Sequence, residues 1–242
     1  MPTDLAPGAG SQEPSIRAVA ALQDDLRRGM YSFIRRARRP VTRDEAAASV
    51  GISRKLAAFH LDKLVEAGVL RAGYASAAGA RKVGRAPKVY EPSDADFRVS
   101  IPPRRHEVLA HILLDAMLAD GSRESPRQAA VRVARERGQL IGGAEREEAR
   151  PGRLGAERAL TMAAGVLARY GFEPDREAST CVRLRNCPFH PLADEAPELV
   201  CGINHAFLSG LLDGLEASAL TAVLDPRAGE CCVELRAADR AG

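Results

Sequence analysis

The chain is 242 residues long, which is enough for two modest domains with a core each. Its net charge of +3 is unevenly spread, because residues 1–105 hold 19 Lys and Arg against 11 Asp and Glu, whereas residues 106–242 hold 16 against 21. This division favours a basic N-terminal half that binds a polyanion and an acidic half that serves as a sensor or contacts a partner. No run of about 18 apolar residues occurs, so we expect no membrane partner.

The N-terminal residues predict a tail followed by a long helix. Residues 1–14 have neither the basic nor the apolar region of a signal peptide, and we expect a disordered tail. A cytoplasmic location follows, in which the five cysteines are reduced thiols or metal ligands, not structural disulfides. From Ile16 to about Arg38, apolar residues recur at steps of three and four, which predicts a helix that Pro40 ends.

Residues 42–68, TRDEAAASVGISRKLAAFHLDKLVEAG, have the pattern of two short helices joined by a turn. Thr42 with Glu45 three positions later is a capping box, which begins the first helix. Gly51 supplies the turn, and Ser53 caps the second helix. The pattern predicts a helix-turn-helix, for which an ordinary helical hairpin is the alternative.

A basic hairpin is expected directly after the second helix. Val69-Leu70 begins one strand and Val89-Tyr90 is a plausible return strand. The tip between them, ASAAGARKVGRAPK, is rich in Arg, Lys and Gly. Such a tip can reach phosphates or the minor groove while the second helix occupies the major groove, so the combination favours DNA binding over a plain hairpin.

This region also resembles a known family. GISRKLAAFHLDKLVEAGVL followed by GRAPKVYEPS is similar to the winged-helix domain of ArsR-like and DeoR-like bacterial transcription regulators, over about residues 15–95. The resemblance implies a double-stranded DNA operator as partner, read by the second helix. His60 either contacts a phosphate or packs at the groove edge. With the basic tip, the expected DNA-binding residues are Ser53, Arg54, Lys55, Phe59, His60, Lys63, Arg81, Lys82, Arg85 and Lys88.

Residues 96–120 are expected to form a linker and a helix at which two subunits pair. In RRHEVLAHILLDAMLAD, a broad apolar face contains Val108, Ile112 or Leu113, and Leu118. A plain core helix is the alternative. We expect a homodimer, because two half-sites one helical turn apart provide an affinity that a single winged helix rarely reaches.

Residues 121–242 predict an α+β sensor domain. The whole chain is therefore expected to be mainly α with α+β parts, an N-terminal winged helix-turn-helix joined to that domain. The expected elements are helices over 125–140, 154–170 and 197–217, a charged loop over 141–152, a strand over 180–185, and a hairpin of 222–224 and 231–235.

All five cysteines lie between residues 181 and 232, which predicts a metal site in this domain. Cys187 and His190 bracket Pro-Phe on a turn after a strand, where both side chains can converge on one point. Cys201 lies one turn into the following helix, close enough for the loop to bring it back. A redox thiol pair and plain packing of buried cysteines are the alternatives.

A fourth ligand is expected from Cys181, or from one of Cys231 and Cys232 on the last hairpin. Neighbouring residues of a strand point to opposite faces, so only one of Cys231 and Cys232 is expected to face inward. Cys181 and Cys232 are the two that best fit a role as core residues.

A winged helix followed by a cysteine-bearing domain is similar to SufR-type iron–sulfur repressors. That resemblance implies that three or more cysteines hold a cluster whose loss changes DNA affinity. The thirteen residues between Cys187 and Cys201 suit the family, but the next cysteine would be expected near Glu216, and the Cys-Pro-Phe-His turn is not typical of it. Zinc bound by Cys and His therefore stays open beside an iron–sulfur cluster.

The sequence as a whole predicts a DNA-binding transcriptional regulator, a repressor by resemblance, whose C-terminal domain binds a metal or cluster. The alternative is a regulator that senses a small apolar ligand along the 197–217 helix, with structural zinc or no metal. No phosphate-binding loop, dinucleotide fingerprint or nucleophile elbow occurs, so we expect no enzyme. A nucleophile built from Cys187 and His190 would lack an orienting residue.

Overall fold

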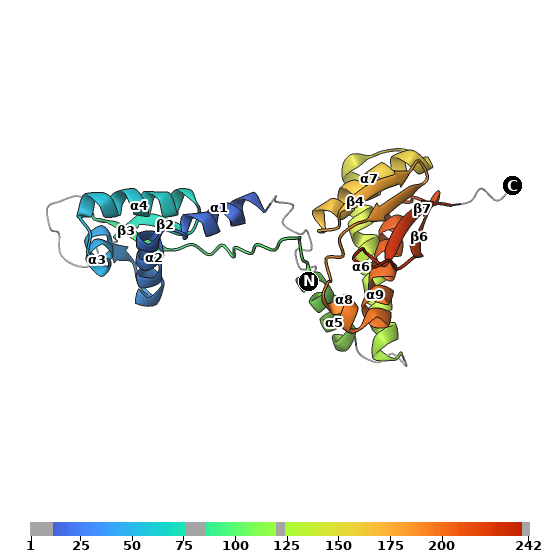
Figure 1. Cartoon of the computed structure of the whole chain (residues 1–242), viewed down its shortest axis with the longest axis horizontal. Helices are drawn as coiled ribbons and strands as arrows, with labels where there is room; N and C mark the ends of the chain where they lie inside the picture. Colours follow the sequence, from blue (N-terminus) through green and yellow to red (C-terminus); the bar gives the residue numbers. More distant parts are fainter. Residues whose placement is uncertain (1–11, 76–85, 120–123, 239–242) are drawn as a thin grey trace. The chain divides into compact units, whose positions relative to one another are not determined.

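The computed structural model describes residues 12–75, 86–119 and 124–238, which are mixed α and β with two small sheets (Figure 1). The chain divides into two compact units, with the boundary between Val99 and Ser100. Within the described ranges, none of the helices combines the length and apolarity needed to span a membrane.

The N-terminal unit packs its helices around a small antiparallel sheet with strand order β1-β3-β2. Apolar residues from all four helices and the sheet form its core. Its elements are α1 (Glu13–Ala21), α2 (Asp25–Ala37), β1 (Val41–Thr42), α3 (Arg43–Ser49), α4 (Arg54–Glu66), β2 (Leu70–Tyr74) and β3 (Lys88–Pro92).

The single helix expected from Ile16 to Arg38 is wrong, because the chain forms two helices there. α1 ends at Ala21, and the Asp24 side chain accepts a hydrogen bond from the backbone N–H of Arg27 at 2.9 Å. This N-cap satisfies a free donor at the start of α2, which the spacing of apolar residues does not reveal. The expected tail is also too long, since α1 already begins at Glu13.

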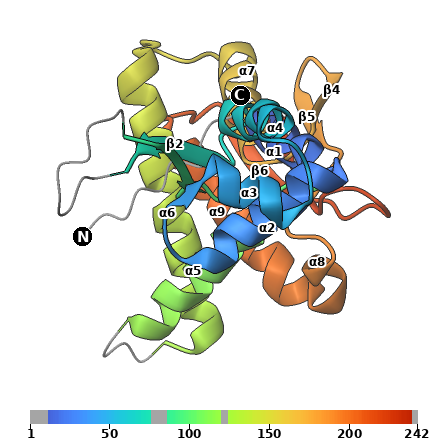
Figure 2. The ribbon, with the colours of Figure 1, turned by 90° about the vertical axis from the view of Figure 1, so that its left-hand side faces the viewer.

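The predicted caps of α3 and α4 are confirmed. Thr42 Oγ1 accepts from the Glu45 backbone N–H at 3.3 Å, and the Glu45 carboxylate accepts from the Thr42 N–H at 2.8 Å. A hydrogen bond from Arg39 is the main cause that lowers the pKa of Glu45 to about 2. Gly51 has φ +68° in the turn, and the Ser53 side chain caps α4. Local side-chain chemistry thus fixes where both helices begin. Figure 2 shows the ribbons of α3 and α4.

The C-terminal unit builds an antiparallel sheet of order β4-β5-β7-β6 against helices. α7 contacts all four strands and α9 contacts β6 and β7 (Figure 1). Its elements are α5 (His106–Leu118), α6 (Pro126–Ala149), α7 (Ala156–Arg169), β4 (Pro174–Ala178), β5 (Cys181–Leu184), α8 (Leu192–Glu195), α9 (Pro197–Gly214), β6 (Leu220–Leu224) and β7 (Val233–Ala237).

The charged loop expected over 141–152 is wrong, because α6 continues to Ala149. Gly142, read as a loop signal, is buried inside this helix against α9. A Cβ atom added at Gly142 would lie 2.3 Å from the Leu211 carbonyl oxygen, so the residue is small because the two helices touch through their backbones.

Candidate functional site

The exposed side of α4 carries most of the predicted DNA-binding residues that the structure describes. Phe59 is 55% exposed, which is unusual for a large apolar side chain on a helix of a small unit. Lys55 is exposed, and no ion pair is found for it within the described residues. Arg54 pairs with Asp44 at 3.1 Å. Ser53 is exposed at the start of the helix.

The other predicted DNA-binding residues differ in their surroundings. Lys63 pairs with Glu66 at 2.8 Å on the α4 surface. Lys88, in β3, pairs with Asp62 at 2.9 Å, and the hydrogen bond that it donates to this carboxylate raises the pKa of Lys88. Arg81, Lys82 and Arg85 lie outside the described residues.

His60 is buried, whereas its neighbours on α4 are exposed. Its exposed fraction is 7%, and its Nδ1 lies 3.9 Å from the Asp24 carboxylate, with no hydrogen-bond partner among the described residues. The Phe59 ring meets its ring edge-on. Burial favours the interpretation in which the His60 side chain packs against its neighbours and does not contact a phosphate.

Four cysteines come together at one end of the C-terminal sheet. Cys187 follows β5, Cys201 lies near the start of α9, and Cys231 with Cys232 directly precedes β7. Their side chains interact in sequence, since the pKa of each thiol is shifted by a neighbour: that of Cys187 by Cys231, that of Cys232 by Cys231, and that of Cys201 by Cys232. We call these four residues the cysteine cluster.

The expectation that only one of Cys231 and Cys232 faces inward is wrong. Their exposed fractions are 0% and 7%, and both belong to the cysteine cluster. The strict alternation of a strand does not apply here, because β7 begins only at Val233. The Cys231 N–H donates to the Leu184 carbonyl at 2.9 Å, which ties this segment to the end of β5.

The four thiols differ in acidity. Interaction with Cys231 is the largest cause that lowers the pKa of Cys187, and it also lowers the pKa of Cys232 to about 6. The pKa of Cys231 is raised well above its usual value by its interaction with Cys187. Burial is the main cause that raises the pKa of Cys201 to about 12. The cluster therefore has two thiols that are more acidic than usual and two that are less acidic.

Amide donors surround these sulfur atoms. The backbone N–H groups of Phe189 and His190 lower the pKa of Cys187, and the His190 N–H donates to the Cys187 carbonyl at 3.2 Å. Asn204, with 0% of its surface exposed, donates from Nδ2 to the Cys231 sulfur at 3.1 Å. Its Oδ1 is buried and has no hydrogen-bond partner among the described residues. Asn204 was not predicted, and its position one helical turn after Cys201 is the only signal that the sequence offers for it.

Two predicted metal ligands lie apart from the cysteine cluster. The His190 ring is directed to Asp194, with 3.4 Å between Nδ1 and the carboxylate. Cys181 lies near Glu177 and Glu234, and burial raises its pKa. Conversely Cys232, which fitted a core role in the sequence, is a member of the cluster.

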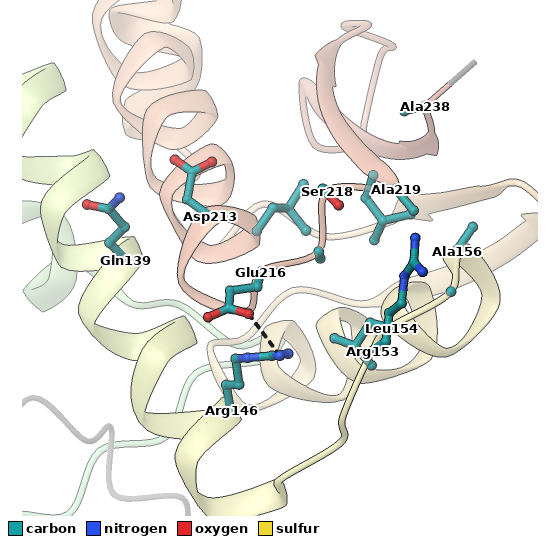
Figure 3. A pocket seen from close by; sticks show the side chains of 14 residues that line it. Gln139, Arg146, Arg153, Leu154, Ala156, Asp213, Glu216, Ser218, Ala219 and Ala238 are labelled. Atoms are coloured by element: carbon teal, nitrogen blue, oxygen red, sulfur yellow. Dashed lines mark ion pairs between the residues drawn. The ribbon is translucent and has the colours of Figure 1, made fainter. Parts of the chain in front are cut away.

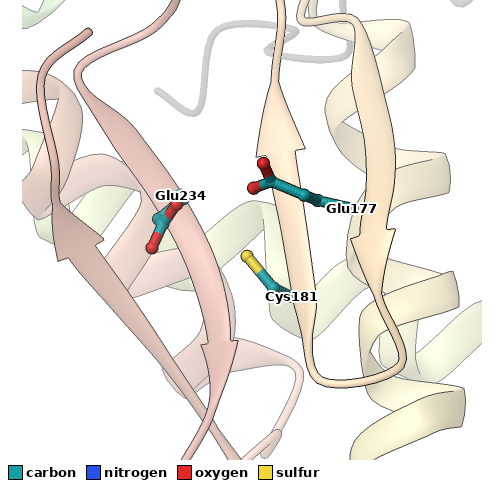
Figure 4. Close-up of side chains that lie close together, drawn as sticks. All are labelled: Glu177, Cys181 and Glu234. Carbon is teal, nitrogen blue, oxygen red and sulfur yellow. The ribbon is translucent and has the colours of Figure 1, made fainter.

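Glu177, Cys181 and Glu234, on the neighbouring strands β4, β5 and β7, form a possible metal-binding group (Figure 4). Their ligand atoms all lie within 4.8 Å of one another. Both carboxylates, however, are already in ion pairs with arginines: Glu177 with Arg227 at 3.3 Å, and Glu234 with Arg183 and Arg236. These cations neutralise the carboxylates and oppose the approach of a metal ion.

A cavity of about 1230 Å³ lies between α6, the start of α7 and the turn from α9 to β6 (Figure 3). Arg146 and Glu216 form an ion pair of 2.9 Å at its wall, and Arg153 and Asp213 add further charges. Leu154, Leu212 and Leu220 also line it, so charged and apolar residues are mixed around the cavity. The cavity therefore does not have the apolar lining that a small apolar effector would favour.

No protein-family model matches this sequence, and no curated protein is significantly similar to it.

Proposed function

We propose that this protein is a DNA-binding transcriptional regulator whose C-terminal unit holds an iron–sulfur cluster on Cys187, Cys201, Cys231 and Cys232. The observation that carries the proposal is the convergence of four cysteines from three separate segments at one buried place. The N-terminal unit supports DNA binding through its two capped helices, the exposed face of α4 and the following β2–β3 hairpin, an order that fits a winged helix-turn-helix.

The donor set fits a cluster better than a single zinc ion. Four thiolates can bind either group, but a tetrahedral zinc site with Zn–S bonds of about 2.3 Å brings its sulfurs within about 3.8 Å of one another. Among the described residues, the group of Glu177, Cys181 and Glu234 is the only one with three or more potential ligand atoms all within 4.8 Å. The cluster sulfurs are thus more widely spread, which suits several iron atoms with one thiolate each. Zinc is the second candidate.

The surrounding residues would stabilise negative charge on the sulfurs. A bound iron–sulfur cluster would supply a redox-active group. The N–H groups of Phe189 and His190 lower the pKa of Cys187, and Asn204 donates to the Cys231 sulfur. Burial keeps water from the sulfurs, and such hydrogen bonds set the reduction potential of a bound cluster.

Pairing of two subunits through α5 completes the proposal. Leu114, Met117 and Leu118 are 53%, 72% and 69% exposed along one side of this helix. An apolar stripe of this kind is typical of an association surface. Two N-terminal units held in this way could contact two half-sites of one operator.

The cysteine cluster predicts which thiols hold iron. Replacing any one of Cys187, Cys201, Cys231 and Cys232 by Ser is expected to reduce the affinity for iron at least about ten-fold. Loss of a residue that only hydrogen-bonds to a metal ligand already reduces metal affinity by about that factor, and loss of the ligand itself should cost at least as much. Iron, sulfide and visible absorbance are measured on anaerobically purified protein. Cys181→Ser is the matched control and is expected to keep all three at wild-type values.

Other outcomes are equally clear. Stoichiometric zinc without colour would replace the iron–sulfur cluster by a zinc site on the same residues. A metal-free wild-type protein with reversible disulfides between cluster cysteines would indicate a thiol switch. Loss of iron in Cys181→Ser but not in the four cluster variants would contradict the ligand set.

DNA binding predicts a distinct effect for two residues of α4. Duplexes are selected from a random library with the wild-type protein, and dissociation constants are measured at several salt concentrations. Lys55→Ala is expected to weaken binding to all duplexes by the same factor. It should also reduce the slope of log affinity against log salt concentration by about one, as expected for a residue that contacts a phosphate. Phe59→Ala is expected to cost about 1–3 kcal/mol on the selected sequence alone, as for a base contact.

The charge control is Arg127→Ala, which removes an exposed ion-pairing arginine of the C-terminal unit. It is expected to leave affinity and salt slope unchanged. Equal, sequence-independent losses for Lys55→Ala and Arg127→Ala, with no loss for Phe59→Ala, would mean that binding depends on net charge alone and that α4 does not read DNA.

A further inference from the structure

The loop that carries Cys187 is hydrogen-bonded to the chain segment that enters the C-terminal unit. Arg104 donates from Nη1 to Asn186 Oδ1 at 2.5 Å and to the Cys187 carbonyl at 3.2 Å. Asn186 in turn donates from Nδ2 to the Pro103 carbonyl at 2.9 Å and to the Gly171 carbonyl at 2.6 Å. Asn186 is 6% exposed, so these bonds are largely shielded from water.

Two further bonds extend the same contact along the loop. The Arg105 N–H donates to the Pro188 carbonyl at 2.9 Å, and His106 Nε2 lies 2.9 Å from the His190 carbonyl. Gly171 packs against Pro103, Arg105 and Pro188 at once: a Cβ atom added there would lie 3.3–3.5 Å from their side chains. Residues 103–106 therefore lie alongside residues 186–190. We call the first segment the junction and the second the Cys187 loop.

The junction is the point at which a short tether reaches this unit. Phe97 packs against the core of the N-terminal unit, and Pro103 is the first residue bonded to the Cys187 loop. Only residues 98–102 separate them, and a tether this short spans little more than about 3.5 Å per residue. Two consecutive prolines, Pro102 and Pro103, stiffen its end. Because the tether is short, the N-terminal unit must stay near the junction. A displacement of the junction therefore changes the positions that the N-terminal unit can reach.

We propose that the Cys187 loop and the junction form a relay that transmits the state of the cysteine cluster to the DNA-binding unit, with Arg104 and Asn186 as its positioning residues. The inference rests on the function proposed above. Cys187 itself belongs to the loop, and its carbonyl accepts from Arg104 Nη1 and from the His190 N–H, both at 3.2 Å, so a change at its side chain moves the backbone of the loop. The carbonyls of the same loop hold the junction, and the junction moves with them.

The relay changes the affinity for DNA by favouring one arrangement of the two subunits' N-terminal units. A ligand shifts such an equilibrium only by its differential affinity for the two states, and couplings of this kind amount to about 5–150-fold. Arg104 contributes through its two bonds to the loop and needs no contact with the cluster or the DNA.

The test compares Arg104→Met with Arg105→Met. The first variant keeps the length of the side chain and loses both bonds to the Cys187 loop. The second removes the same charge from the next residue, whose side chain contacts Glu107 and the Arg169 carbonyl and whose backbone bond to Pro188 is kept. Dissociation constants for the selected duplex are measured with the iron-loaded protein and with the same preparation after the iron is removed by a chelator.

In the wild-type protein the two constants are expected to differ by about 5–150-fold. In Arg104→Met this ratio is expected to approach one, with iron content and visible spectrum unchanged. Arg105→Met is expected to keep the wild-type ratio. Normal loading of Arg104→Met together with a wild-type ratio would overturn the relay and leave the proposed function intact. A wild-type protein without iron would overturn both.

A second measurement does not depend on a variant. The Arg105 amide donates to the Pro188 carbonyl, so its hydrogen exchange in the full-length wild-type protein is expected to become at least about ten-fold faster when iron is removed. Unchanged exchange in peptides covering residues 103–106, alongside a changed DNA affinity, would overturn the relay even if Arg104→Met failed to fold.

Discussion

Gly210→Ala is expected to destabilise the C-terminal unit by about 3 kcal/mol or more. A Cβ atom at this position of α9 would lie 2.0 Å from the Arg135 carbonyl oxygen of α6, and Gly138, Gly142 and Gly214 make equally close approaches. Overpacking usually costs about 1–3 kcal/mol when side chains can move, but here the obstacle is backbone. The two helices would have to separate along their whole contact, which loses the packing between them.

The matched control lies in the same helix. Gly202 has nothing within 4 Å of an added Cβ atom, so Gly202→Ala is expected to be neutral or to stabilise the unit by about 0.5–1 kcal/mol through helix propensity. Hydrogen exchange of α6 and α9 peptides against urea concentration separates this unit from the N-terminal one. A cost for Gly210→Ala no larger than that of Gly202→Ala would refute the close helix contact.

Helix starts and strands were predictable wherever the signal lies within a few residues. Thr42 with Glu45 and the Ser53 cap define α3 and α4 without any tertiary contact. The strand predicted over 180–185 and the helix over 197–217 are confirmed as β5 and α9, because both have a clear apolar period. These are the features that a local pattern can specify.

Two elements were mispredicted, the end of α6 and the division between α1 and α2. Gly142 in sequence is a helix breaker, and only the presence of α9 turns it into a contact residue. α1 and α2 were merged because their apolar spacing continues across the break that Asp24 caps. In each case the local pattern is correct and a tertiary or capping contact decides the outcome.

The cysteine site was partly predictable. The gathering of cysteines in one domain and the pairing of Cys187 with Cys201 could be seen in sequence, but the choice among the others could not. Cys231 and Cys232 both turn inward because they lie in a bend before β7. Asn204 is invisible without the helix that aims it at Cys231.

Arg183→Met is expected to destabilise the C-terminal unit by about 3 kcal/mol. The guanidinium is fully buried, and it hydrogen-bonds to Asp225 at 2.8 Å, Glu230 at 2.9 Å and Glu234 at 2.5 Å. Removing one partner of a buried ion pair leaves an uncompensated charge, which costs about 3–5 kcal/mol. We take the lower value because Asp225 and Glu230 are partly exposed and because Arg236 still faces Glu234.

A double-mutant cycle separates the charge from the packing. Glu234 has no exposed surface, so in Arg183→Met its carboxylate is the group that water cannot reach. Adding Glu234→Met removes that charge and is expected to restore most of the lost stability, since apolar residues of similar volume often replace a buried ion pair without cost. Arg185→Ala is the control: this exposed arginine also pairs with Glu230, and its loss is expected to cost no more than about 1 kcal/mol. The free energies of unfolding are measured by urea-dependent hydrogen exchange in β5 and β7. If the destabilisations of Arg183→Met and Glu234→Met simply add in the double variant, the network stabilises the unit through side-chain packing and not through charge. The segment that carries Cys231 and Cys232 also contains Asp225 and Glu230, two of the carboxylates that Arg183 binds. The same cycle therefore measures how firmly the sheet holds half of the cysteine cluster.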